Sequence, residues 1–146
     1  MGKKRIIAKG ASAPEGEGET RTRSVVADSG RRVSTGIAHI RATYNNTIIS
    51  VTDTQGNVLG WSSSGSVGFS GTKKATPYAA ARVAEFVADK AKRAGLTSIT
   101  VRVAGVGAGR DSAVRSLANH GLLITGIKDV TPIPHNGPRP PKVRRV

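Results

Sequence analysis

Five prolines, at positions 132, 134, 138, 140 and 141, fall within the C-terminal segment 130–146. Because proline fixes φ and has no backbone N–H, this segment cannot form a helix or a central strand. Its basic side chains are Arg139, Lys142, Arg144 and Arg145, and it contains no carboxylate. An extended basic segment with no apolar core of its own needs a polyanion to lie on, and nucleic acid is the simplest candidate.

The charge of the whole chain supports this interpretation. Lysine and arginine total 23 against 9 acidic residues, which gives a formal net charge of +14. Residues 36–146 alone contain 15 basic and 5 acidic side chains, so the excess is not confined to the termini. Such an excess repels itself in the folded state and is usually balanced by a bound anion. The length of 146 residues allows one domain with a core, together with a tail or two.

Composition also limits the compartment and the kind of site. The chain has no cysteine, which excludes disulfides and thiolate metal sites. No apolar run approaches the roughly 20 residues that a membrane span needs. The apolar segment near the start, Ile6–Ala8, is too short for a secretory signal, and Glu15, Glu17 and Glu19 are unlike a transit peptide. We expect a cytoplasmic protein with no membrane partner.

The chain divides into three parts. Residues 1–35 have no hydrophobic periodicity and alternate small, charged and polar residues, which predicts a flexible N-terminal arm. Residues 36–129 show the patterns of strands and helices, and residues 130–146 form the extended tail. The arm carries Arg21, Arg23, Arg31 and Arg32, which leaves open whether it contacts a partner or is only solvated.

Hydrophobic periodicity predicts an α/β fold in the central part. Alternation from Gly36 to Tyr44 is typical of a half-buried strand, and Thr76-Pro77 supplies an N-cap followed by proline at the first helical position. The expected strands are 36–44, 47–53, 58–63, 96–104 and 122–129, and the expected helices are 77–94 and 111–120. A meander followed by strand, helix, strand, helix, strand predicts a mixed five-stranded sheet with flanking helices.

The glycine-rich loop 64–75 is the clearest phosphate-binding candidate inside the domain. Glycines let a backbone approach closely, hydroxyls bond phosphate or ribose, and Lys73 and Lys74 supply charge. We expect Phe69 and Trp61 to pack in the core. Because aromatic residues make up only 3% of the chain, a base-stacking platform is not expected. Recognition should therefore be of nucleic-acid backbone and shape.

A second glycine loop, Gly105–Arg110, follows a strand and opens a helix, which is the setting of a dinucleotide fingerprint. Arg110 stands where that fingerprint needs a glycine, and the chain is too short for a second nucleotide-binding half. Two interpretations stay open: a tight strand-to-helix turn, or contact of phosphate with the helix amides and the arginine.

An enzyme is not expected. A metal-dependent nuclease would need two to four converging carboxylates. The five carboxylates beyond the arm are Asp53, Glu85, Asp89, Asp111 and Asp129. Glu85 and Asp89 are better explained by pairing with basic neighbours on a helix face. The histidines His39, His120 and His135 do not form a ligand set by spacing, so neither a metal nor a cofactor is predicted.

Several motifs together resemble one protein family. They are Gly36-Ile37-Ala38-His39-Ile40, Tyr44-Asn45-Asn46-Thr47, Thr52-Asp53 with Gly56-Asn57, Trp61-Ser62-Ser63, Gly68-Phe69, Gly71 with Lys74, Thr76-Pro77, Gly107 with Gly109-Arg110, and the tail from Asp129 to Val146. In this order and spacing they resemble the S-eleven family of small-subunit ribosomal proteins, bacterial type. The resemblance runs from Gly36 to Val146 and does not cover the arm.

The resemblance implies a three-layer fold of the ribonuclease-H-like type without that enzyme's metal-binding carboxylates. It also implies a structural, ribosome-bound role on the platform of the small subunit, near the messenger exit path. The implied partners are small-subunit ribosomal RNA, neighbouring platform proteins and messenger RNA. A ribonuclease-H-like nuclease and a free-standing RNA-binding translation regulator remain as alternative functions.

By the resemblance, RNA contacts map onto four groups of residues. They are Asn45 and Asn46; Gly68, Ser70, Gly71, Thr72, Lys73, Lys74 and Thr76; Gly107, Gly109, Arg110 and Arg115; and His135, Asn136, Arg139, Lys142, Arg144 and Arg145. Ser70 and Lys73 depart from the family's usual lysine and arginine, as Pro138 and Val143 depart from a common cysteine and a basic residue. These departures predict weaker charge-driven binding.

The pair Asn136-Gly137 is chemically labile, because the following amide nitrogen can attack the asparagine side chain to form a succinimide and then isoaspartate. The family's modifiable asparagine corresponds to Asn136. A plain turn between two prolyl segments is the alternative interpretation.

Overall fold

The computed structural model describes residues 33–139 and 141–142. Residues 1–32 of the predicted arm, and Arg144 and Arg145 of the predicted tail, lie outside the described residues. The elements are β1 (Thr35–Ala42), β2 (Thr47–Asp53), β3 (Val58–Ser63), the 3₁₀ helix η1 (Gly71–Ala75), α1 (Pro77–Arg93), β4 (Ser98–Ala104), α2 (Gly109–Asn119) and β5 (Leu123–Asp129).

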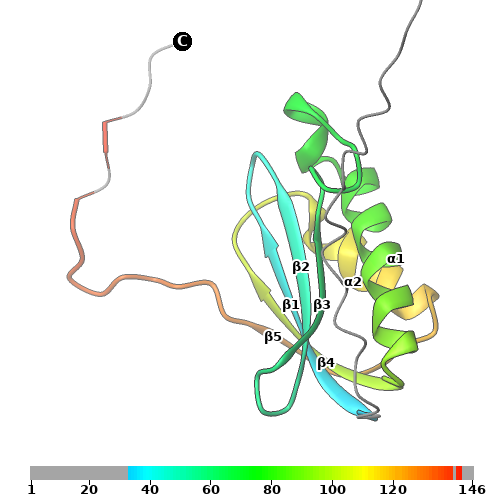
Figure 1. The fold of residues 1–146 in the computed structure, drawn as a ribbon. Coiled ribbons are helices and arrows are strands. Elements are labelled where there is room, and N and C mark those ends of the chain that lie inside the picture. The colour runs from blue at the N-terminus through cyan, green and yellow to red at the C-terminus, as the bar shows by residue number, and fades with distance from the viewer. Residues whose placement is uncertain (1–32, 140, 143–146) are drawn as a thin grey trace, which may run out of the picture.

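The five strands form one mixed sheet in the order β3-β2-β1-β4-β5, as the sequence predicts (Figure 1). The central strand β1 pairs antiparallel with β2 and parallel with β4, which sets Ile40 between Ile49 and Val103. At the edges, β3 pairs antiparallel with β2, and β5 pairs parallel with β4. Consequently β1, β3, β4 and β5 all run in the same direction and finish at one end of the sheet.

Both helices cover the same face of this sheet (Figure 1). Buried residues of β1, β2, β4, α1 and α2 form one apolar cluster, including Ile40, Val83 and Leu117. The described residues therefore form two layers, and the three-layer arrangement implied by the resemblance is not found among them. The reason lies after β5, where the chain enters the proline-rich segment and cannot form a helix to cover the other face.

Small residues let α1 lie close to the sheet and to α2. A Cβ atom at Gly109 would lie 2.8 Å from the Cβ of Ala80, and one at Gly60 would lie 3.1 Å from the Cβ of Lys90. The buried face of α1 consists of Ala79, Ala80, Val83, Ala84, Val87, Ala88 and Ala91. Because alanine adds little width, the helix axes can approach further than leucine-rich faces would allow.

The boundaries of α1 follow local chemistry. Thr76 accepts a hydrogen bond from the backbone N–H of Ala79 (3.3 Å), as predicted for the N-cap. Gly95 takes a positive φ of 88° beyond the last turn, where glycine commonly ends a helix. No helix in the described part of the chain is long and apolar enough to cross a membrane. The strands β4 and β5 begin slightly later than predicted, at Ser98 and Leu123.

The short helix α2 differs from the prediction. It begins at Gly109 instead of Asp111. The spacing of Val114, Leu117 and Ala118 in the sequence predicts one buried stripe, but Ala118 is exposed. The buried residues are Gly109, Ala113, Ser116 and Leu117, a helical stripe that faces both α1 and the sheet. Ser116 donates a hydrogen bond to the carbonyl of Ala81 (3.0 Å), so a polar residue belongs to this contact.

The expectation that Trp61 is a core residue is wrong, since its side chain is 58% exposed. Its neighbours Gly60 and Ser62 are the small residues that face α1 here: Ser62 is 2% exposed, and an added Cβ at Gly60 would lie 3.1 Å from the Cβ of Lys90. Successive strand side chains point to opposite faces, which sends Trp61 to the uncovered side. Phe69 is half-buried and meets Tyr78 edge to face, with ring centroids 5.9 Å apart.

Candidate nucleic-acid interface

Three loops and the root of the tail meet at the end of the sheet where β1, β3, β4 and β5 finish. The N–H of Ser64 donates to the carbonyl of Thr47 (3.0 Å), and that of Gly107 donates to the carbonyl of Ala42 (3.2 Å). The N–H of Gly105 donates to the hydroxyl of Thr131 (3.1 Å). We call residues 43–46, 64–76, 105–110 and 129–131 the loop end. Residues far apart in the sequence are thus brought together there.

The loop 64–76 presents most of its predicted contact residues to solvent. Gly68, Ser70, Gly71, Thr72 and Lys73 are exposed, and Lys74 is half-buried. Gly68 and Gly71 have positive φ values of 101° and 57°, with no atom within 4 Å of an added Cβ. These glycines therefore leave the backbone open to a close approach. The hydroxyl of Thr76, in contrast, is already occupied. It donates a hydrogen bond to the carbonyl of Lys73 (2.8 Å) and accepts one from the N–H of Ala79 at the start of α1.

The turn between β1 and β2 exposes Asn45 but only part of Asn46. The hydroxyl of Thr43 accepts from the N–H of Asn46 (3.0 Å) and donates to its carbonyl (3.1 Å), which closes the turn. The side-chain oxygen of Asn46 is buried with no hydrogen-bond partner among the described residues. Asn45 is therefore the more accessible of the two predicted contacts.

The loop before α2 is built for close packing. Gly107 and Gly109 are buried, and a Cβ at Gly107 would lie 2.5 Å from the carbonyl oxygen of Thr43. A Cβ at Gly109 would lie 2.6 Å from the hydroxyl of Thr47. Both glycines are thus required by contacts inside the protein. This favours the tight-turn interpretation of the loop.

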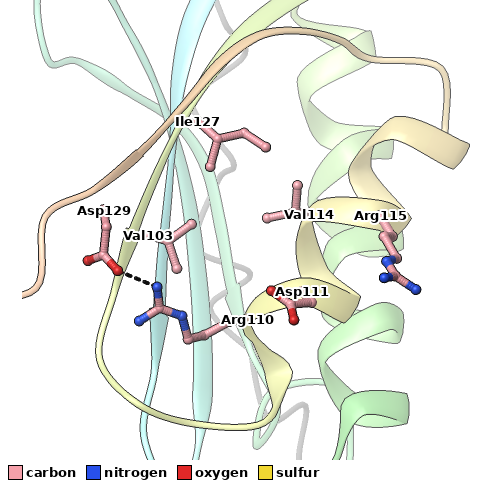
Figure 2. A pocket seen from close by; sticks show the side chains of 7 residues that line it. All are labelled: Val103, Arg110, Asp111, Val114, Arg115, Ile127 and Asp129. Atoms are coloured by element: carbon pink, nitrogen blue, oxygen red, sulfur yellow. Dashed lines mark hydrogen bonds and ion pairs between the residues drawn. The ribbon is translucent and has the colours of Figure 1, made fainter.

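Arg110 is held by the protein itself. Its guanidinium donates to the carbonyl of Gly105 and to the carboxylate of Asp129, with which it forms an ion pair (Figure 2). The other oxygen of Asp129 accepts from the N–H of Thr131 (2.8 Å) and from its hydroxyl (2.6 Å). These bonds, led by the Thr131 hydroxyl and then Arg110, hold the pKa of Asp129 well below its usual range. The tail root is therefore tied to α2.

A cleft of about 470 Å³ with mixed apolar and charged walls lies beside this ion pair, between α2 and the strands β4 and β5. Val103, Val114 and Ile127 line it, with Arg110, Asp111, Arg115 and Asp129 around them (Figure 2). Arg115 projects away from the Arg110–Asp129 pair and is exposed. Of the two predicted arginine contacts on α2, Arg115 is therefore the one with no ion-pair partner in the described part of the chain.

The described tail runs extended from the domain, as predicted (Figure 1). Its root is fixed by the N–H of Val130, which donates to the carbonyl of Val103 (2.8 Å), and by the Thr131 bonds. Beyond that point His135, Asn136, Arg139 and Lys142 are all exposed. Asn136 has a φ of 53°, the one positive φ of a non-glycine residue in the described chain.

The carboxylates do not converge as a metal-dependent nuclease would require. Asp53 pairs with Gly36 at the start of β1, whereas Asp129 pairs with Val103 at the other end of the sheet. Asp53 accepts hydrogen bonds from Gln55 and twice from Asn57 (2.8–2.9 Å), and the Asn57 side chain most of all lowers its pKa. Within residues 33–139 and 141–142, no three metal-binding side chains cluster. Glu85 pairs with Arg82 (2.6 Å), as expected from their spacing.

The uncovered face of the sheet carries basic residues that sequence reasoning missed. Arg41, Arg102 and Lys128 are exposed there, and His39, which pairs with Arg102, is half-buried. Burial, and secondly the charge of Arg102, lower the pKa of His39. These basic residues alternate with buried residues along β1 and β4, so the sequence does indicate that they face away from the core. That they share one uncovered face can be recognised only when the positions of both helices are known.

Comparison with known proteins gives a consistent result. The family model described as Ribosomal protein S11 matches residues 36–145. A curated relative, the small ribosomal subunit protein uS11 of Solibacter usitatus (strain Ellin6076), is 56% identical over 116 residues. That alignment covers 80% of this chain and 86% of the relative.

Proposed function

The chain belongs to the ribosomal protein S11 family, and from that premise we propose that it is a non-enzymatic structural constituent of the small ribosomal subunit. It binds ribosomal RNA on the platform and supports the assembly and shape of that region near the messenger exit path. Neighbouring platform proteins and messenger RNA are the further partners of this proposal.

The observation that carries the proposal is the loop end. Exposed backbone of the loop 64–76, the turn at Asn45 and the root of the basic tail adjoin there. The N-termini of α1 and α2 point to the same end, because each helix follows a strand that finishes there. Free amides at helix N-termini, open glycine backbone and lysines are groups that bind phosphate.

The accessible residues of the loop end and the tail are the proposed RNA contacts. They are Asn45, Gly68, Ser70, Gly71, Thr72, Lys73, Lys74, Arg115, His135, Asn136, Arg139 and Lys142, with Arg144 and Arg145 beyond the described residues. Thr76, Gly107, Gly109 and Arg110 act through positioning, since packing or hydrogen bonds inside the protein occupy them.

The domain division of this proposal is an N-terminal arm at 1–35, an RNA-binding domain at 36–129 and an RNA-binding tail at 130–146. Tail contacts are proposed to be electrostatic, because the described tail residues are exposed and extended. In such a segment each lysine or arginine can reach a phosphate without disturbing the domain.

Asn136 is also a proposed site of isoaspartate formation. Its positive φ and exposure place it in an open turn, and a Cβ at Gly137 would lie 2.6 Å from the Cβ of Pro134. Glycine is thus required after Asn136, and glycine is the residue that least hinders attack on the preceding side chain. Peptide mapping that finds only unmodified asparagine at this position would remove the proposal.

The test of RNA binding is a salt titration with small-subunit ribosomal RNA. A variant with Arg139→Ala and Lys142→Ala should make the negative slope of log K against log salt shallower by about 1.4–1.8, for two lost phosphate contacts. The matched control, Lys92→Ala with Arg93→Ala, removes the same charge from the last turn of α1. Equal slopes in the two variants would mean that the tail does not touch phosphate.

A free-standing translation regulator would leave ribosomes when the salt concentration is raised, whereas a resident constituent would stay. Co-sedimentation with small subunits under high salt therefore separates the two functions. Loss of the protein from washed subunits would contradict the structural role.

A further inference from the structure

The face of the sheet opposite the helices is crossed by one row of aligned residues. Strand pairing places Lys128 beside Arg102, Arg102 beside His39, His39 beside Ser50, and Ser50 beside Trp61. The row therefore runs across all five strands, from β5 to β3. Since neighbouring strands lie about 4.8 Å apart, four steps span roughly 19 Å.

The charge of this face has one sign. Arg102 and Lys128 belong to the row, and Arg41 lies in the next row, opposite Ile48. The described carboxylates lie elsewhere. Asp53 and Asp129 pair with Gly36 and Val103, which are buried on the helix-covered face, and the other three carboxylates are on the helices. No ion pair within the described ranges involves any of the three basic residues.

The row ends in an exposed aromatic side chain. Trp61 is the single tryptophan of the chain and is 58% exposed, with Ile48 37% exposed on the adjacent strand. An exposed aromatic side chain on the same face as cations is the combination that single-stranded nucleic acid uses, through base stacking and phosphate contacts.

We propose that this helix-free face, with Arg41, Arg102 and Lys128 at one side and Trp61 at the other, is a second RNA-binding surface. Phosphates lie over the basic residues, and an unpaired base stacks on Trp61. An RNA occupant is favoured over a protein because the charged side chains described on this face are all basic, and a protein would have to bring matching carboxylates. This inference rests on the proposed function but concerns a surface separate from the loop end and the tail.

The first experiment tests the charges with the full chain and small-subunit ribosomal RNA. A variant with Arg102→Gln and Lys128→Gln is expected to make the negative slope of log K against log salt shallower by about 1.4–1.8. The control, Lys92→Gln with Arg93→Gln, removes equal charge from exposed positions on the helix side and should keep the slope. All four positions are exposed, so thermal melting should show both variants folded.

The second experiment uses the fluorescence of Trp61. RNA should quench its emission and protect it from iodide, and Trp61→Leu should weaken binding roughly 5- to 150-fold, as expected for a lost stacking contact. Because no other tryptophan exists, the signal reports this face alone.

The outcomes separate this inference from the proposed function. Suppose that the Arg139/Lys142 variant shows a shallower slope of log K against log salt, whereas the Arg102/Lys128 variant and Trp61→Leu bind RNA like the wild type. This inference is then overturned and the proposed function stands. Failure of the wild-type chain to bind the RNA would overturn both. Iodide protection of Trp61 in the free chain, or only on adding ribosomal proteins, would identify an occupant other than RNA and overturn the inference.

Discussion

Arg110, in the first turn of α2, and Asp129, the last residue of β5, form an ion pair that fixes where the tail leaves the domain. Thr131 completes the arrangement by bonding both to Asp129 and to the N–H of Gly105. The arginine that the sequence suggested for phosphate binding thus serves first to orient the basic tail. Replacing it should change the tail's direction as well as the charge.

This arrangement predicts a dependence on pH. Both Asp129 and Asp53 have lowered pKa values in the folded protein, so their contribution to stability is present above the unfolded aspartate pKa of about 3.9 and is lost as the pH falls below it. Acid unfolding followed by circular dichroism should begin near pH 4 and be shallower for Asp129→Asn. Identical acid profiles for the wild type and Asp129→Asn would contradict the role of the pair.

His39 should titrate below pH 6.5. Its pKa is lowered by burial and then by Arg102, so the folded protein disfavours the protonated ring and loses stability as the pH falls below 6.5. Arg102→Gln should raise the pKa of His39 only part of the way back to 6.5, because burial is the larger cause of the lowering. The measurement is an NMR titration of the His39 ring. An unchanged pKa in Arg102→Gln would show that the two groups do not interact.

Leu117→Ala should destabilise the fold by about 2–5 kcal/mol, since Leu117 is fully buried between the helices and the sheet. Leu123→Ala is the matched control, because Leu123 is 68% exposed and its truncation should cost about 0.5 kcal/mol or less. Urea unfolding of both variants gives the comparison. Similar losses for the two would mean that the core is not where the packing places it.

Gly109→Ala should destabilise the protein by about 1–3 kcal/mol, although alanine is the better helix former. The added methyl would lie 2.6 Å from the Thr47 hydroxyl and 2.8 Å from Ala80 Cβ. Gly126→Ala is the control, since nothing lies within 4 Å of its added Cβ. A Gly109→Ala variant as stable as the wild type would show that α2 can move away from α1 without cost.

Much of the fold was predictable because its signals are local. The strands β2 and β3 have the predicted bounds, and the start of α1 at Pro77 follows from a cap that needs only Thr76 and the next three residues. Burial at alternate positions of β1 follows from the two-residue period of a strand. These features depend on neighbours in the chain, so a sequence contains them completely.

Other features depended on which residues meet in space. Ala118 looked buried and Trp61 looked like a core residue, yet the close contact of α1 with α2, and the absence of a helix on the second face in the described chain, reversed both expectations. Likewise nothing local distinguishes Arg110 from Arg115. Only the folded position of Asp129 pairs one and leaves the other without an ion-pair partner in the described chain.

By itself, the sequence determined the element order, the excess of positive charge and the extended state of the tail, because each follows from residue type and local spacing. The tertiary structure alone decided which loops share one end of the sheet, which arginine is occupied, and which face carries the aligned basic row. Those relationships come from strand order and register, and residues as distant in sequence as His39 and Arg102 meet only through that pairing.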